Sequence, residues 1–418
     1  MKVLHLNTSK NGGAAKAANR IHTSVMKLGI DSIFLSKDDI DSFKYPNENN
    51  LSNLKYTIPD LTLKNYIDEK FFRRFTKQKL SIEKKRIELK KKLNPLLIGD
   101  FEICSTPFSE VDITLLDAYK QADIIHLHWI AGLVDFETFF IKNQKPIIWT
   151  LHDENPFRGL FHYENDQIRN ENKFRTLNEK FLKIKTIAYK NVDNMIVITP
   201  SNWLKDKAIF SNVFSNTLFY QQNYAINTDV FKPICPTYSK SIFNIPSDKK
   251  VVVFVSEIVS NYRKGYDLLS QMIYDHVFED VIFLIVGDVT NKAKNAENII
   301  YTGKITDERL MSVVYNAGDF FILPSREDNQ PNTMIEALCC GTPVIAFDIS
   351  DNRSILEPDK LGVVCESIDV FSLKKTLMNC LNNQYTFNRN RISEIASGKF
   401  SENACGNFYK EIYEKLFK

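Results

Sequence analysis

Residues Phe320–Phe347 read FFILPSREDNQPNTMIEALCCGTPVIAF, and this stretch decides the expected fold. An apolar run that ends at Pro324 predicts a buried strand, and a polar loop follows at Ser325–Gln330. Pro331 suits the first turn of a helix, because its missing N–H has no helical partner there. Gly341 predicts the end of that helix, and a second apolar strand comes directly after it. A strand, loop, helix and strand in this order are typical of a parallel α/β sheet.

Short apolar runs alternate with amphipathic stretches on both sides of this segment. Continuous apolar strands separated by helices predict parallel sheets that are covered on both faces. The first series of predicted strands is Lys2–Leu6, Asp31–Leu35, Ile124–His128, Pro146–Leu151 and Met195–Thr199. The second series is Val251–Val255, Val281–Val286, Ile299–Thr302, Phe320–Pro324 and Pro343–Phe347. The predicted fold is therefore α/β, with one parallel sheet for each series of strands.

A polar stretch around residues 222–248 separates the two series and contains several Asn and Pro residues. We expect the domain boundary there, with an N-terminal domain over 1–222 and a C-terminal domain over 223–400. The last segment, Glu402–Phe417, carries apolar residues at helical spacing. It is predicted to be a closing helix whose apolar face packs on a domain.

The composition excludes several classes of protein. The 418 residues are 44% hydrophobic and 25% charged, which is typical of a globular protein. With 54 Lys+Arg against 51 Asp+Glu, the net charge is too small for a nucleic-acid binder that relies on phosphate contacts. The apolar runs are far shorter than the roughly 20 residues that span a bilayer, and the N-terminus shows no secretion signal. The seven cysteines contain no C-x-x-C pair, so we expect a reducing cytoplasm.

One basic segment breaks the pattern. Residues 69–92 hold eleven Lys or Arg and three Glu, interleaved with apolar side chains. A basic amphipathic helix of this kind can contact an anionic membrane from the inner face of the cell. A solvated helix with one face on the domain is the favoured interpretation, because the helical phase is interrupted.

The predicted helix after Pro331 begins at the carboxyl edge of a strand. The free N–H groups of its first turn, at Asn332, Thr333 and Met334, form a natural diphosphate site. Asp328 in the preceding loop and Glu336 inside the helix bracket that turn, where carboxylates can hold sugar hydroxyls. Alternatively, Asp328 only caps the helix and Glu336 is solvated.

The segment resembles the E-x7-E signature of retaining glycosyltransferase family 4, with Asp328 in the place of the first Glu and Glu336 in the place of the second. The resemblance extends to the flanking LPS and ALCCGTPVIAF and covers most of the chain. It implies the GT-B fold, in which two doubly wound, Rossmann-like domains face each other across a cleft. It also implies that the C-terminal helix, residues 401–418, returns to the N-terminal domain.

Motifs of the first half are similar to those of the same family. In SKNGGAAKAA (Ser9–Ala18), Gly12 and Gly13 would let the backbone approach the donor diphosphate and the acceptor. In IIWTLHDENPF (Ile147–Phe157), the resemblance places His152 against the donor sugar, with Asp153 beside it at the substrate.

Other histidines near this point raise the question of a metal. In DIIHLHWI (Asp123–Ile130), His126 and His128 are expected to be packing or acceptor-side residues. A metal site built from them with His152, Asp153 and His162 is a disfavoured alternative, because the family needs none.

Motifs of the second half supply the remaining expected site residues. Lys264 before Gly265 matches the family's Lys-Gly pair, and Arg263 is expected to replace an Arg that the family carries earlier in this loop. Asp328, with the backbone of Asn329 and Gln330, would hold the donor sugar. The backbone at Lys304 and Ile305 would contact the nucleotide base.

The resemblance implies a retaining, metal-independent glycosyltransferase of the bacterial surface-polysaccharide type, which includes lipopolysaccharide enzymes. Its donor would be a UDP- or GDP-sugar with a hexosyl or N-acetylhexosaminyl group, used as a substrate with no cofactor. Its acceptor would be a hydroxyl of a glycan or of a lipid-linked saccharide. Two alternatives remain: a non-catalytic nucleotide-sugar-binding subunit and a nucleotide-sugar epimerase of the same fold.

Overall fold

The computed structural model describes all residues except 43–96, 191, 215–216, 290–295 and 418. The basic segment 69–92 lies outside the described residues, so its predicted membrane contact stays a prediction. Among the helices that the structure describes, none is both long enough and apolar enough to cross a lipid bilayer.

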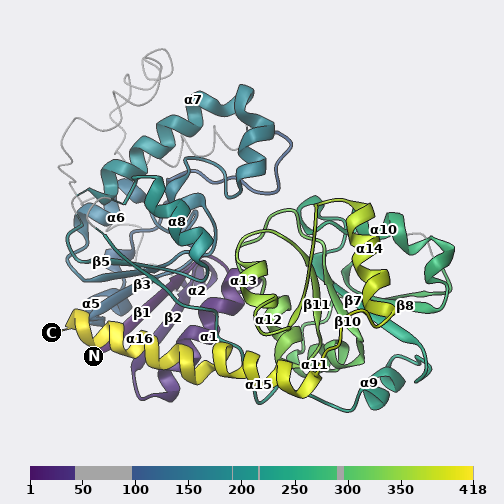
Figure 1. The fold of residues 1–418 in the computed structure, drawn as a ribbon. Coiled ribbons are helices and arrows are strands. Elements are labelled where there is room, and N and C mark those ends of the chain that lie inside the picture. Colours follow the sequence, from purple (N-terminus) through teal and green to yellow (C-terminus); the bar gives the residue numbers. More distant parts are fainter. Residues whose placement is uncertain (43–96, 191, 215–216, 290–295, 418) are drawn as a thin grey trace.

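The first lobe is built on a six-stranded parallel sheet with the strand order β2-β1-β3-β4-β5-β6 (Figure 1). Its strands are β1 (Lys2–Asn7), β2 (Asp31–Ser36), β3 (Ile124–Leu127), β4 (Ile147–Thr150), β5 (Met195–Thr199) and β6 (Leu218–Gln221). Its helices are α1 (Gly13–Lys27), α2 (Lys37–Ser42), α5 (Asp117–Gln121), α6 (Phe136–Lys142), α7 (Glu164–Tyr189) and α8 (Asn202–Phe210), with 3-10 turns at Ile113–Leu115 and Asn155–Phe157. Every residue of β3, β4 and β5 is buried, which explains their continuous apolar sequences.

The second lobe holds another six-stranded parallel sheet, in the order β12-β11-β10-β7-β8-β9. Its strands are β7 (Lys250–Ile258), β8 (Val281–Asp288), β9 (Ile299–Gly303), β10 (Phe320–Leu323), β11 (Val344–Phe347) and β12 (Gly362–Cys365). Its helices are α9 (Pro236–Ile242), α10 (Tyr266–Ile273), α11 (Glu308–Ala317), α12 (Asn332–Cys339), α13 (Asn352–Leu356), α14 (Val370–Leu381) and α15 (Arg389–Phe400), with 3-10 turns at Tyr262–Lys264 and His276–Phe278. The two parallel sheets with helices are the predicted α/β architecture.

The last helix, α16 (Glu402–Phe417), follows α15 but lies under the first lobe, beside the N-terminus (Figure 1). Its buried Tyr409, Ile412 and Tyr413 share one core cluster with Val3 of β1 and Ile21 of α1. The chain therefore passes between the lobes twice. The two passages touch, because the Ile226 N–H donates to the Phe400 carbonyl at 2.7 Å and the Ile226 carbonyl accepts from the Glu402 N–H at 3.2 Å.

The structure corrects three details of the expected elements. The strands β6 and β12 were not expected, and each completes an edge of its sheet. Pro331 is the residue before α12 and not part of its first turn, because its ψ of 120° is extended.

Candidate active site

The order of the second sheet determines where a ligand is expected. The connections from β7 and β10 run in opposite directions from neighbouring strands, and open α/β sheets typically bind ligands beyond the carboxyl ends of two such strands. The loop after β7 carries Arg263 and Lys264, and the loop after β10 carries Asp328. Gly265 has a φ of 73°, and a Cβ there would lie 1.8 Å from the Pro324 carbonyl oxygen. Glycine at this position therefore lets the two loops lie against each other.

Lys264 and Arg263 converge on the carboxylate of Asp328. The Lys264 Nζ lies 2.5 Å and the Arg263 guanidinium 3.5 Å from the same oxygen, Asp328 Oδ2. Burial raises the pKa of Asp328, but the two cations outweigh it and bring that pKa below its usual value. Asp328 is thus an ionised carboxylate between two cations, at the point where the sequence predicts the donor diphosphate and sugar.

Arg263 also reaches the first lobe. It forms a bidentate ion pair with Glu102, at 2.6 and 3.0 Å, and its guanidinium stacks on the Tyr163 ring, 4.2 Å from the centroid. Its Nη1 donates to the Glu327 carbonyl at 3.0 Å. To bind an anionic ligand between the lobes, Arg263 must therefore give up some of these contacts.

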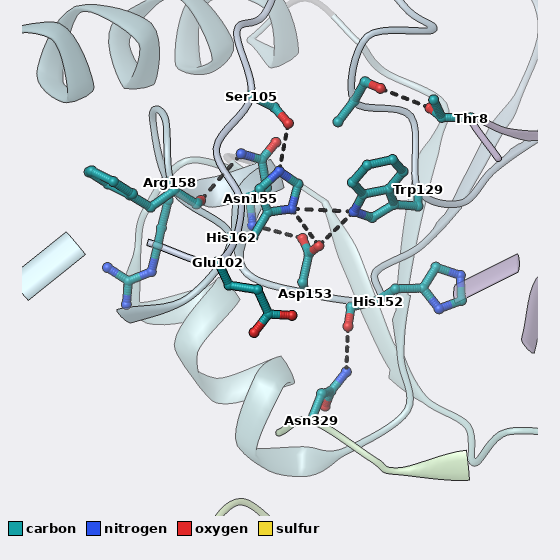
Figure 2. A network of polar contacts seen from close by, with 12 residues as sticks. Thr8, Glu102, Ser105, Trp129, His152, Asp153, Asn155, Arg158, His162 and Asn329 are labelled. Carbon is teal, nitrogen blue, oxygen red and sulfur yellow. Dashed lines mark hydrogen bonds and ion pairs between the residues drawn. The ribbon is translucent and has the colours of Figure 1, made fainter. Parts of the chain in front are cut away.

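Asn329 and Gln330 contact the first lobe and the passage between the lobes. Asn329 accepts from the Ser201 hydroxyl at 2.5 Å, and its amide nitrogen lies 3.4 Å from the His152 carbonyl oxygen (Figure 2). Gln330 accepts from the Tyr224 N–H at 2.8 Å. The predicted sugar-binding loop thus already lies against His152, through the backbone of that histidine.

The first turn of α12 faces the glycine loop of the first lobe. The Asn332 amide donates to the Gly13 carbonyl at 3.2 Å, and Gly12 has a φ of 93°, a conformation that favours glycine. Thr333 is half-buried, whereas Met334 packs in the core of the second lobe. The Met334 N–H also donates to the Pro331 carbonyl at 3.1 Å, so Met334, unlike the prediction, is not open to a ligand in this form.

Glu336 is buried inside α12, where it is not solvated as the alternative interpretation supposed. Its Oε1 accepts from Arg20 of α1 at 2.7 Å, and its Oε2 accepts from the Tyr315 hydroxyl at 2.8 Å. Arg20 also pairs with Glu308 at 2.6 Å. Tyr315 of α11 thus holds one oxygen of Glu336.

Sequence reasoning missed Arg20, although a signal was present. Arg20 lies one turn beyond Ala17 on the buried face of an amphipathic helix, next to Ile21. A charged residue among buried small residues indicates a buried partner, because an unpaired buried charge is costly.

The His152 ring points away from the Asp153 carboxylate (Figure 2). Asp153 accepts from His162 at 2.6 Å and from the Trp129 indole at 2.7 Å through one oxygen, and from the Asn155 N–H at 3.0 Å through the other. Burial raises the pKa of Asp153, but His162 and these hydrogen bonds lower that pKa by more than burial raises it. The pKa of Asp153 is therefore below its usual value. The cavity beside these residues has a volume of about 10 Å³, room for about one water molecule.

The structure divides the predicted residues into groups. Arg263, Lys264 and Asp328 form one ion cluster. Asn332 and Glu336 both contact Arg20, and Gly13 contacts Asn332. Lys304 and Ile305 lie after β9, two strands from β7, where the Lys304 side chain pairs with Glu257 at 2.8 Å. The histidines of the disfavoured metal alternative are split, with His162 beside Asp153 and His126 and His128 in a separate cluster.

Two parallel sheets, with charged loops of the second turned toward the first, define the class of the fold as that of GT-B glycosyltransferases. Residues 249–383 match the family model described as "Glycosyl transferases group 1". This segment contains Arg263, Lys264, Asp328 and Glu336. The match and the fold together support a glycosyltransferase.

Two relatives match different shares of the chain. An uncharacterized 41.2 kDa protein in the cps region of Klebsiella pneumoniae is 23% identical over 304 residues, 71% of this chain and 80% of that protein. A D-inositol 3-phosphate glycosyltransferase of Xylanimonas cellulosilytica is 24% identical over 162 residues, 34% of this chain and 38% of that protein.

Two solved structures match over nearly their whole length. Sucrose-phosphate synthase from Thermosynechococcus elongatus has a TM-score of 0.67 and 15% identity, over 100% of this chain and 99% of that one. Anabaena Alr3699/HepE, in complex with UDP and glucose, has a TM-score of 0.63 and 14% identity, over 99% of both chains. These likenesses show the fold.

Proposed function

We propose that this protein moves a glycosyl group from a UDP- or GDP-sugar to a hydroxyl of a glycan or lipid-linked saccharide, with retention of configuration. The observation that carries the proposal is the convergence of Lys264 and Arg263 on Asp328, in the loops after β7 and β10, where Arg263 also contacts the first lobe. The UDP and glucose in the Anabaena structure lend support, because that protein shares the fold.

Departure of a nucleoside diphosphate builds negative charge on its β-phosphate. Lys264, Arg263 and the positive end of α12 would offset this charge, and such preorganised groups commonly lower a barrier by a few kcal/mol, roughly 3. We therefore propose that these cations take the place of a metal ion and that the nucleotide sugar is a substrate used with no cofactor.

Asp328 has two tasks in this proposal. Before the donor binds, its carboxylate keeps the two cations close together at the carboxyl end of β10. After the diphosphate takes the cations, the carboxylate is free to accept hydrogen bonds from sugar hydroxyls. Glu336 would hold the ribose, while Tyr315 and Arg20 keep its carboxylate oriented.

Retention without a carboxylate nucleophile requires attack on the same face that the leaving group departs from. In that reaction the departing phosphate accepts the proton of the acceptor hydroxyl, and the C–O bond to the acceptor forms as the bond to the phosphate breaks. Closure of the lobes over the donor would exclude water and suppress its hydrolysis. We place the reaction in the cytoplasm, where nucleotide sugars would be available to it.

The test is a thermal-shift panel of UDP, GDP and their hexose and N-acetylhexosamine conjugates, followed by transfer assays with the sugar that binds. A donor that binds the folded protein raises its melting temperature. Binding without transfer or slow donor hydrolysis would favour a binding subunit, and conversion of the donor without an acceptor would favour an epimerase. The absence of any melting shift across the panel would contradict the proposal.

A further inference from the structure

Four histidines of the first lobe lie in one line of hydrogen bonds beneath the contact between the lobes. His5 belongs to β1 and is paired in register with His126 of β3. His128 directly follows β3, and His152 follows β4 by one residue. His5 and His126 are 0% exposed and His128 is 1% exposed, so these rings cannot satisfy their nitrogens with bulk water.

Each of the eight ring nitrogens of these histidines has a protein partner. The links run from Tyr224 at one end to Tyr409 at the other. In order they are Tyr224 OH to His152 Nδ1 at 2.7 Å, His152 Nε2 to His128 Nδ1 at 3.2 Å, His128 Nε2 to His5 Nδ1 at 2.9 Å, His5 Nε2 to Tyr413 OH at 3.4 Å, Tyr413 OH to His126 Nδ1 at 2.7 Å, His126 Nε2 to Thr150 Oγ1 at 2.8 Å, and Thr150 Oγ1 to Tyr409 OH at 2.9 Å. We name this set the histidine chain.

The links of the histidine chain couple the tautomers of its members. A neutral imidazole has one N–H donor and one acceptor nitrogen. If His128 carries its proton on Nε2, then His5 must accept at Nδ1 and His152 must donate from Nε2. If His128 carries its proton on Nδ1, both neighbours must be reversed. His5, His128 and His152 therefore share one tautomer, and Tyr413 extends the same direction to His126.

The surroundings keep these rings neutral. Burial lowers the pKa values of His5, His126 and His128 well below the usual value, and neighbouring histidines lower them further. Burial also lowers the pKa of His152 to about 4, although Asp153 opposes this shift. A neutral histidine chain therefore has only two states. In one state every ring donates its hydrogen bond toward Tyr224, and in the other every ring donates toward Tyr409.

We propose that His5, His126 and His128 are positioning residues, which fix through this chain which ring nitrogen of His152 carries the proton. The proposal deepens the function proposed above, because it gives His152 a defined donor or acceptor toward the sugar. Tyr224 is the end of the chain beside the predicted sugar-binding loop, since its N–H donates to Gln330 of that loop at 2.8 Å. A sugar hydroxyl that displaces the Tyr224 hydroxyl meets Nδ1 of His152, which donates or accepts according to the tautomer that the chain has set.

A metal ion is the competing use of the same side chains. Nitrogen atoms of His5, His126 and His128 lie within 4.8 Å of one another. However, each of these nitrogens already has a hydrogen-bond partner. The His126 and His128 rings also stack, with centroids 4.2 Å apart at 27°, and parallel rings do not converge on one ion.

The first test is nuclear magnetic resonance of the full chain labelled with ¹⁵N-histidine at pH 7, with the seven histidines assigned by single substitutions. We expect neutral rings and a single shared tautomer at His5, His128 and His152. Opposite tautomers at any two of these three positions, or a cationic ring, would overturn the proposal. Displacement of their signals by one equivalent of Zn²⁺ would overturn it as well.

Two conservative variants then set the direction of the histidine chain. Tyr413→Phe removes the partner of His5 Nε2, and a buried lone pair without a partner is tolerated more often than a buried N–H. All three histidines should then carry the proton on Nδ1. Tyr224→Phe removes the partner of His152 Nδ1 and should move the proton to Nε2 in all three. Whichever tautomer the unmodified protein has, one variant must reverse the three together, and a reversal of only one or two rings would contradict the chain.

The last test separates positioning from structure. Tyr413 lies on α16, away from the proposed substrate, and Tyr409→Phe on the same helix is the matched control, because it leaves both partners of every histidine in place. If Tyr413→Phe reverses the tautomer, the kcat for transfer should fall about tenfold, the effect of one misplaced hydrogen bond. If the tautomer stays, kcat should stay within about twofold of the control.

A reversal without a change in kcat, or a loss of kcat without a reversal, would overturn the positioning role. If no nucleotide sugar is turned over at all, the proposed function fails, while the resonance data still decide whether the histidine chain exists.

Discussion

Lys264 is the side chain whose removal should affect transfer most directly. Lys264→Ala removes one of the two cations beside Asp328 and should lower kcat about 10²- to 10³-fold, because a preorganised charge at the leaving group is lost. Steady-state kinetics with the donor found by thermal shift measure this. Lys249→Ala is the control, since it breaks an ion pair with the exposed Asp280 in the same lobe. A kcat within threefold of the control would contradict the assignment of Lys264.

Glu336 contacts Arg20 and Tyr315 and is proposed to bind the ribose of the donor. Two variants distinguish these roles. Glu336→Gln keeps an acceptor for Tyr315 but loses the charge that the ribose hydroxyls would meet. The KM for the donor should rise about 10- to 100-fold, the usual worth of a hydrogen bond to a charged group.

Glu308→Gln is the matched control for Glu336→Gln, because it removes the other carboxylate of Arg20 without touching the proposed ribose site. Its donor KM should stay within about threefold of the unmodified protein. Equal increases in both variants would show that Arg20 pairing, and not ribose binding, is what Glu336 supplies.

Lys185 on α7 is fully buried and donates to Asn155 and Arg158 in the loop that carries Asp153. Burial lowers its pKa to about 7, against an opposing effect of Asp153, whereas an unfolded lysine titrates near 10.4. Between these values the unfolded chain binds more protons, so the free energy of unfolding should rise with pH, by at most about 1.4 kcal/mol per unit.

Lys185→Met should lack this rise. The measurement is denaturant unfolding of both proteins at pH 7, 8 and 9, with the difference in unfolding free energy growing in favour of the unmodified protein. A constant difference across this range would show that the folded Lys185 does not titrate there.

Two helices of the first lobe begin at carboxylates of the second. Glu327 accepts from the N–H groups of Glu164 and Asn165 at the start of α7, at 2.8 and 3.2 Å. Asp351 accepts from the N–H groups of Asn202 and Trp203 at the start of α8, at 2.7 and 3.0 Å. Each carboxylate meets the positive end of a helix, a contact typically worth about 0.3–1 kcal/mol.

Elements with a strong periodic pattern could be predicted from the sequence, and weak ones could not. The helix α16 has the predicted bounds, since its apolar residues recur every three or four positions. The edge strands β6 and β12 are no shorter than β3 and β4, which also have four residues each. The LFYQ of β6 is exposed to half-buried, so it lacks the continuous apolar character of β3 and β4. The GVVC of β12 is apolar but begins with Gly, which is depleted in strands.

Some contacts of the candidate site could likewise be predicted from the sequence, and others could not. The approach of Lys264 to Asp328 could be predicted, because each residue belongs to a local motif directly after a predicted strand. The pairing of Arg20 with Glu336 joins residues 316 positions apart, and the histidine chain joins His5 to a tyrosine 408 positions away. Contacts of this range depend on how the two lobes and α16 pack, which no local pattern specifies.

At the scale of the whole molecule, the described structure is a closed one. Contacts join the lobes at Arg20, Arg263, Asn332 and the two capping carboxylates. A donor must enter between groups that now bind each other, so we expect an equilibrium with an open form.

The double variant Glu327→Gln, Asp351→Asn should shift the molecule toward that open form, because both carboxylates lose the charge that favours the helix ends. Small-angle X-ray scattering should show a larger radius of gyration than for the unmodified protein. Asp348→Asn is the control, since Asp348 pairs with Arg353 of the same lobe. An unchanged radius in the double variant would mean that these caps do not hold the lobes together.

The paired passages between the lobes constrain how they can part. A single connecting strand would leave one lobe free to twist about it. Here Ile226 is bonded to the backbone on both sides of Ser401, so we expect the two passages to act as a double hinge that permits bending about one line and resists torsion. Each opening and reclosing should therefore return the loop that carries Lys264 to the same position opposite the first lobe.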